Sequence, residues 1–145
     1  MAEFIEYGTG PQTVEANSPV QLISSISCNK GYVVHRDGSG ILTLRSIANN
    51  PCARFARYLV IYNGNIAIPT DGTVGEISLG ITVTGEVENA TISRYTPAAV
   101  QQYGSVGSAR YITVPVGCCY NIAIENNSTQ NILVENLNVI VIRTA

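Results

Sequence analysis

The sequence predicts an all-β domain, an antiparallel sandwich or barrel of about eight to ten short strands. Three observations lead to this prediction. Apolar and polar residues alternate with the period of a strand, turn signals recur about every ten residues, and helix signals are nearly absent. The 145 residues suit one domain, and no repeat or low-complexity tract divides them.

The strands are expected between turns that glycine, proline and asparagine mark. The Asp37–Gly38 pair indicates a hairpin, because glycine adopts a positive φ without steric cost. One helical turn is expected at 97–103, since Pro97 suits the start of a helix. In chain order, the expected strands cover residues 20–28, 31–36, 41–46, 57–63, 76–84, 90–95, 109–116, 119–125 and 131–142.

The last of these strands is apolar on both of its faces. Val139 and Val141 point one way and Ile140 and Ile142 the other, because side chains alternate along a strand. A sandwich buries only one face of each sheet, and no predicted helix is available to cover the second. We therefore expect another copy of the chain to cover it, in an obligate oligomer with a structural role.

The composition agrees with an assembled protein. Charged residues make up 12% of the chain, against roughly 25% in an average soluble domain, while 46% is apolar. A net charge of −2 with scattered basic residues predicts no nucleic-acid or membrane partner. The acidic start of the chain lacks the basic and apolar regions of a signal peptide, which predicts synthesis in a cytoplasm.

The cysteine and histidine residues do not predict a metal centre. A zinc site needs four converging nitrogen or sulfur ligands, and the only histidine is His35. We expect neither metal nor cofactor, and we expect the cysteines to be reduced and mostly buried. Disulfides formed in an oxidising medium stay open as the alternative. The four cysteines are Cys28, Cys52, Cys118 and Cys119.

No catalytic constellation emerges from the sequence. Residues 35–37 spell the His-Arg-Asp of a kinase catalytic loop, but no glycine-rich phosphate loop accompanies them. Glu86 and Glu88 have the spacing of two carboxylates on one strand face, and solvent exposure is the simpler interpretation. We therefore expect a protein that is not an enzyme.

The second half of the chain resembles a known family. The segments that carry the resemblance are Arg57–Tyr58 at the start of an aromatic and aliphatic strand, the turn at Gly85, and residues 113–117, 120–124 and 139–142. Together they resemble the jelly-roll heads related to tumour necrosis factor and the complement globular domains. The bacterial and bacteriophage versions, which cap collagen-like spore-surface proteins or sit on virions, look most similar. The resemblance covers roughly residues 20 to 143.

This resemblance implies a ten-strand jelly roll that forms a trimer, with three strands lining the threefold axis. The interface residues that it implies are Tyr58, Val60, Tyr62, Tyr111, Val139 and Val141. Many members have glycine just before the first of these tyrosines, whereas this chain has Ala56–Arg57. The chain also lacks a collagen-like stem, so a stalk is either absent or supplied by another protein.

These observations predict two segments, an attachment segment at 1–19 and a jelly-roll domain at 20–145. Phe4, Ile5 and Tyr7 are the expected attachment residues, because they are apolar and precede the first predicted jelly-roll strand.

The expected function is that of a non-enzymatic structural virion protein, a trimeric capsid decoration or head-fibre-like protein. Its expected partners are itself and the major capsid protein or another virion component, at the virion surface after synthesis in the host cytoplasm. A carbohydrate- or receptor-binding head of a phage or bacterial surface fibre remains the alternative, with Tyr95 and Tyr103 as candidate stacking residues.

Overall fold

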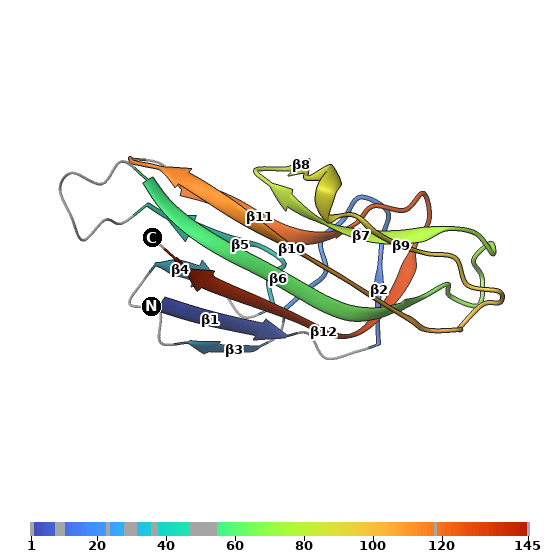
Figure 1. Ribbon diagram of the computed structural model, residues 1–145. Coiled ribbons are helices and arrows are strands. Elements are labelled where there is room, and N and C mark those ends of the chain that lie inside the picture. The colour runs from blue at the N-terminus through green and yellow to red at the C-terminus, as the bar shows by residue number, and fades with distance from the viewer. Residues whose placement is uncertain are drawn as a thin grey trace.

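Two antiparallel sheets face each other in a sandwich (Figure 1). The computed structural model describes residues 2–7, 11–22, 24–27, 32–35, 38–46, 55–117 and 119–144, and for 2–7 and 24–27 it describes the backbone only. These residues form twelve strands and one short 3-10 turn, η1 (Asn89–Thr91). The all-β prediction is confirmed. The described part of the chain holds no helix long and apolar enough to cross a membrane.

The first sheet has the order β10-β6-β12-β1-β3, and β2 pairs with the beginning of β12. Its strands are β1 (Ala2–Tyr7), β2 (Gln12–Val14), β3 (Ser24–Ser27), β6 (Phe55–Ala67), β10 (Gly104–Pro115) and β12 (Ile132–Arg143). The second sheet has the order β4-β5-β11-β7-β8, and β9 pairs with β7. Its strands are β4 (Val33–His35), β5 (Leu42–Arg45), β7 (Ile77–Val83), β8 (Glu86–Val87), β9 (Ser93–Tyr95) and β11 (Cys119–Asn126).

The start of the chain belongs to the sheet. β1 lies between β12 and β3, with Ala2 opposite Arg143 and Tyr7 opposite Asn138 (Figure 1). β2 continues the pairing farther along β12. The prediction of a separate attachment segment at 1–19 is therefore wrong, because its backbone supplies two strands of the first sheet.

Two tyrosines of β6 lie at the centre of the core. Tyr58 and Tyr62 are 0% exposed within the single chain. The Tyr62 hydroxyl lies 3.0 Å from the carbonyl oxygen of Leu79 and 2.7 Å from that of Thr91, which satisfies this buried polar group. Burial raises the pKa of Tyr62, so its phenol stays neutral over the whole physiological range. These bonds join the first sheet to β7 and η1 of the second layer.

The predicted helical turn at 97–103 is wrong. The described residues there form an irregular turn, and Gln101 has a φ of 57°, which a right-handed helix cannot contain. Its backbone N–H donates to the carbonyl oxygen of Ile68 at 2.7 Å. Proline at a plausible helix start was a local signal, and this tertiary hydrogen bond overrides it.

The two-residue turn between β7 and β8 contains a strained position. Val83 pairs with Glu86, and the two residues between them both have positive φ, 51° at Thr84 and 87° at Gly85. Such a turn favours Asn-Gly, and a β-branched residue is unfavourable at its first position. We expect Thr84→Asn to increase the free energy of unfolding by about 1 kcal/mol. Urea denaturation measures this, and an unchanged or lower midpoint would show that Thr84 is unstrained.

Candidate functional site

The structure corrects the predicted interface side chains. Five of them, Tyr58, Val60, Tyr62, Val139 and Val141, are 0% exposed and pack in the core between the sheets. A side chain that its own chain covers completely cannot also line a contact between subunits, so the prediction is wrong for these five.

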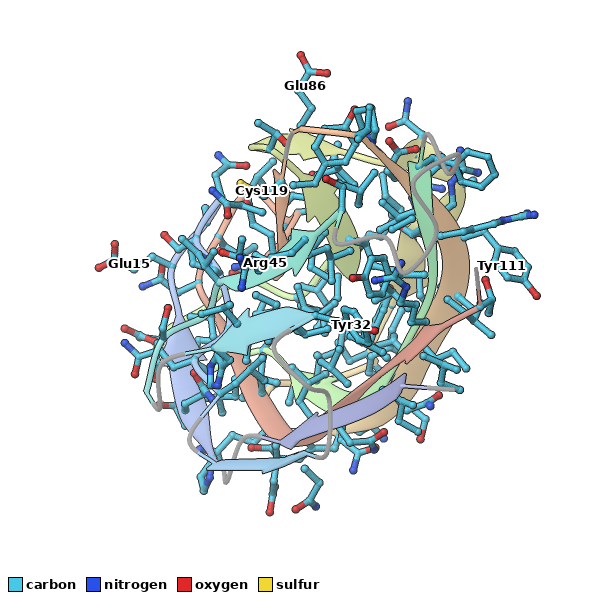
Figure 2. The ribbon with its side chains drawn as sticks, turned by 90° about the vertical axis from the view of Figure 1, so that its left-hand side faces the viewer. Glu15, Tyr32, Arg45, Glu86, Tyr111 and Cys119 are labelled. Atoms are coloured by element: carbon cyan, nitrogen blue, oxygen red, sulfur yellow. The ribbon has the colours of Figure 1, made fainter. Side chains whose placement is uncertain are left out.

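Tyr111 is the exception among the predicted interface residues. It is 52% exposed and projects away from the sandwich on the outer side of the first sheet (Figure 2). The guanidinium of Arg57 lies over its ring, 4.3 Å from the ring centroid. The predicted attachment residues Phe4, Ile5 and Tyr7 have their backbone in β1, and their side chains lie outside the described part of the structure.

The opposite faces of the same strands are turned outward. β6 lies between β10 and β12, and residues directly opposite one another share a face of the sheet. On the side of these three strands that points away from the core, paired residues form four rows across the sheet. We call this surface the outer face. The rows are Tyr111–Leu59–Ile142, Ala109–Ile61–Ile140, Gly107–Asn63–Asn138 and Ser105–Asn65–Glu135.

The outer face has two halves of different chemistry. The first two rows are apolar, and Leu59, Ile61, Ile140 and Ile142 in them are only partly covered by their own chain. The last two rows carry amides, a hydroxyl and, at one end, the carboxylate of Glu135. The first three rows hold no charged residue. Glu135 ends the fourth row, and Arg57 lies on the same face of β6 beside the first row, so the charges stand at the two ends of the face.

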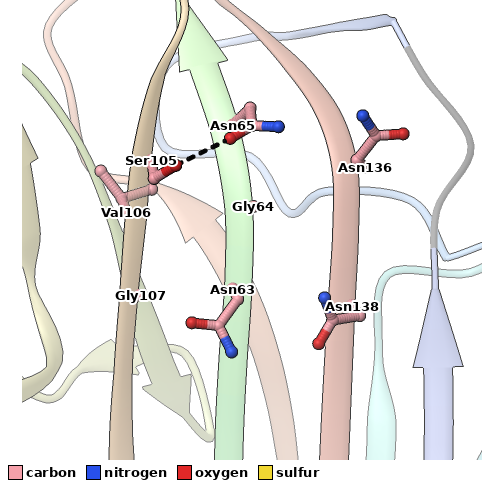
Figure 3. Close-up of a pocket in the computed structure, with 8 residues that line it drawn as sticks. All are labelled: Asn63, Gly64, Asn65, Ser105, Val106, Gly107, Asn136 and Asn138. Atoms are coloured by element: carbon pink, nitrogen blue, oxygen red, sulfur yellow. Dashed lines mark hydrogen bonds between the residues drawn. The ribbon is translucent and has the colours of Figure 1, made fainter.

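The polar half forms a shallow depression of about 440 Å³ (Figure 3). The four asparagines of this asparagine depression come from two adjacent strands: Asn63 and Asn65 from β6, and Asn136 and Asn138 from β12. Ser105, on the far side of β6, donates its hydroxyl to the Asn65 amide oxygen at 3.1 Å. The hollow therefore spans three strands and is lined by groups that both donate and accept hydrogen bonds.

A β-bulge in β12 builds one side of this depression. Asn65 pairs with Glu135 and Asn63 with Asn138, so Asn136 and Leu137 together oppose the single residue Gly64. Asn136 has a φ of 56°, and its side-chain amide lies at the depression (Figure 3). Leu137, the other residue of the bulge, is 1% exposed and packs in the core. A Cβ on Gly64 would lie 2.8 Å from Leu137 Cδ1, so the bulge requires glycine opposite it.

Gly107 opens the other side of the depression. A Cβ at this position would clash with the Asn63 amide oxygen and lie 2.8 Å from the backbone carbonyl oxygen of Tyr62, so glycine leaves room for that amide above β10. Within the described part of the chain, the side-chain amides of Asn63, Asn136 and Asn138 make no hydrogen bond. Their donors and acceptors are therefore available to solvent or to a partner.

The outer side of the second sheet differs from this face. It has a depression of about 380 Å³, with Ile41, Ala123 and Glu125 among its lining residues. Burial raises the pKa of the Glu125 carboxyl. Ile41, at 47% exposure, provides an exposed apolar side chain on this sheet for comparison with the outer face of the first.

The residues considered for catalysis are not among those in the four rows of the outer face. Glu86 projects into solvent (Figure 2), and Glu88 forms a 3.2 Å ion pair with Arg110. His35 Nε2 lies 2.9 Å from the carbonyl oxygen of Ser39. Among the described residues, no group of three histidine, cysteine, aspartate or glutamate side chains is placed to hold a metal ion.

The cysteines and the two loop tyrosines can be placed only in part. Cys119 is exposed, which differs from the expected burial, and Cys28, Cys52 and Cys118 lie outside the described residues. Tyr95 packs across Gly104 against the core, whereas Tyr103 is 37% exposed.

Comparison with known proteins identifies the fold. The sequence matches no protein-family model and no curated protein sequence. Among solved structures, murine APRIL is similar at a TM-score of 0.65 and 10% identity, over 97% of this chain and 98% of that one. The globular domain of zebrafish complement 1qA protein gives 0.61 and 11%, over 97% and 94%. The PRD1 vertex protein P5 gives 0.52 and 11%, over 99% and 97%.

These likenesses establish the fold that the sequence segments resembled. The chain is a jelly-roll β-sandwich of the type found in the tumour-necrosis-factor-like proteins and the complement globular heads. They extend over nearly the whole chain, including the first 19 residues, which agrees with the position of β1 in the sheet.

Proposed function

We propose that this protein is a non-enzymatic structural head, a homotrimer that assembles through the outer face and stands on the surface of a virion. The observation that carries the proposal is the chemistry of that face. It is a wide surface whose first three rows hold no charged residue, two of these rows are apolar, and the described residues form no further layer over them. Depletion of charge at the centre is the compositional signal of a protein interface.

The apolar rows supply the association energy. Complete burial of a leucine or isoleucine side chain contributes about 1.5–3 kcal/mol, and each copy presents four of them, together with Tyr111. Tyrosine is one of the residues that most often dominate such contacts. The entropy lost on association opposes this gain, so the whole face has to be covered for a stable complex.

A trimer is the closed arrangement that the family resemblance favours. The strands β6, β10 and β12 correspond to the three that the resemblance placed on the threefold axis, and their outer faces form one continuous surface. Three copies packed around an axis bury this surface in a ring that stops growing when it closes.

Likeness to the PRD1 vertex protein P5 supports a virion location. The structure changes how attachment is proposed to occur, because residues 2–7 form a strand within the head. Contact with the capsid protein or another virion component is then made by folded surfaces or loops of the head. Three copies of one weak contact bind far more strongly than one copy does, because the second and third contacts form within the same complex.

Virion purification tests this placement. We expect the protein to remain with particles through density-gradient centrifugation and to be visible by antibody labelling on their surface. Recovery only in the soluble fraction, together with binding of the isolated protein to a glycan array, would instead favour the carbohydrate-binding head.

A further inference from the structure

We infer that the asparagine depression is the polar contact of the proposed interface, in which amides of one copy pair with amides of its neighbours and fix the register and number of copies. The inference rests on the proposed self-association. It assigns a specific partner, a second copy of this chain, to side chains that have none within the described residues. Asn63 and Asn138, opposite each other in one row, are central to it.

The depression is built by specific backbone features. The bulge at Asn136 and Leu137 turns an additional amide outward, and it needs a positive φ at Asn136 and glycine at position 64. Gly107 leaves the space in which the Asn63 amide lies. Bulges and glycines reduce the regularity of a strand, and bulges often re-aim a side chain for a specific contact. The depression also adjoins the apolar row that contains Ile61, so a neighbour covering that row reaches the amides as well.

Amides suit a position where a side chain meets copies of itself. Near a symmetry axis, identical groups from the different subunits converge, so carboxylates or ammonium groups there would repel one another. An amide carries both donors and an acceptor and can bond to its own copy. The row of Asn63 and Asn138 holds no charged residue, which agrees with this requirement, and the carboxylate of Glu135 lies at the end of the next row.

The same amides disfavour other registers. A shifted packing would place the amides of one copy against the apolar rows of another and leave buried donors and acceptors without partners, which is costly. A buried asparagine in a coiled coil selects the register and the number of chains in this way. A sugar ligand fits the depression less well, because none of its lining residues is aromatic and could stack on a sugar ring.

Replacement of the two amides by carboxyl groups tests the inference. Asn63→Asp/Asn138→Asp preserves the shape of the side chains and adds two charges per copy at neutral pH. We expect sedimentation to show single chains at pH 7 and wild-type mass at about pH 4, because a protonated carboxyl carries a donor and an acceptor as an amide does. Carboxylates of neighbouring copies lie close together in the assembled state and repel one another, which raises their pKa. Lowering the pH therefore favours assembly.

The matched control is Asn121→Asp, on the outer side of the second sheet, where an exposed amide accepts a hydrogen bond from Thr43. It should sediment like the wild type at both pH values. If the double variant has wild-type mass at pH 7, or stays dissociated at pH 4, the amides do not face other copies and the inference is overturned. If the unmodified protein is itself a monomer, the proposed function fails instead, and the two failures are distinguishable.

A second variant removes any dependence on charge. Asn63→Leu/Asn138→Leu extends the apolar surface and removes the requirement for paired amides. We expect it to stay folded and associated but to lose its single mass, giving a mixture of oligomers in native mass spectrometry. One unchanged trimer mass would contradict the role of the amides in selecting the register.

Discussion

Aspartate in place of Ile61 should convert the assembled protein into single chains or unfold it at micromolar concentration. Ile61 lies at the centre of the apolar rows, between Ala109 and Ile140, so its charged replacement would be buried on association. An unpaired charge in a dry interface costs several kcal/mol, and every copy would carry one. The loss of association free energy should exceed the loss caused by any conservative substitution on the outer face.

The control for this variant is Ile41→Asp on the outer side of the second sheet. Ile41 is 47% exposed, and the same substitution there adds the same charge without entering the proposed contact. We expect Ile41→Asp to keep the sedimentation coefficient of the unmodified protein. Equal behaviour of the two variants would mean that the outer face of the first sheet is not the contact surface.

Removal of residues 2–7 should abolish cooperative folding. β1 pairs along its whole length with the last half of β12 and also holds β3, so the deletion leaves both neighbours without their shared partner. The backbone groups of a strand at the centre of a sheet are costly to leave unpaired. Domains of this size are stable by only about 5–15 kcal/mol, so the loss of pairing on both sides of β1 is large compared with the whole stability.

Thermal unfolding followed by circular dichroism measures this effect. We expect no sharp transition in the shortened chain and a sharp one in the full chain. A shortened protein that melts cooperatively at the original temperature would show that the segment is an appendage, as the sequence alone had suggested. The two views of the first 19 residues therefore predict opposite results.

The class of fold was predictable because its signal is local. Alternation along a strand and turn residues between strands are properties of neighbouring positions, and they identified most of the strands. The two apolar faces of the last strand were also correct, since Val139 and Val141 lie inside while Ile140 and Ile142 lie on the outer face.

The sequence prediction did not identify which face of a strand points into the core, although the sequence of β6 contains a signal for it. Strand β6 carries Arg57, Asn63 and Asn65 on one face, and its other face is uniformly apolar with two tyrosines. The face without charged or amide residues is the one to place in the core. The aromatic residues suggested an interface, but the hydroxyl of Tyr62 finds its partners within the chain.

The depression and the position of β1 depend on distant pairings. The bulge at Asn136 exists only in relation to Gly64, and β1 finds its place beside a strand more than 130 residues later in the chain. A short apolar segment before a glycine and proline has the same local appearance whether it is a tail or a strand. Register between distant strands is set by the whole sheet, so it could not be inferred from either segment alone.

The most direct test of the account is the mass of the unmodified protein in solution, measured by sedimentation equilibrium at micromolar concentration. The account predicts a single species of three times the 15.5 kDa chain mass. A folded species with the mass of one chain would contradict it, because the apolar rows of the outer face would then be stable in water without a partner.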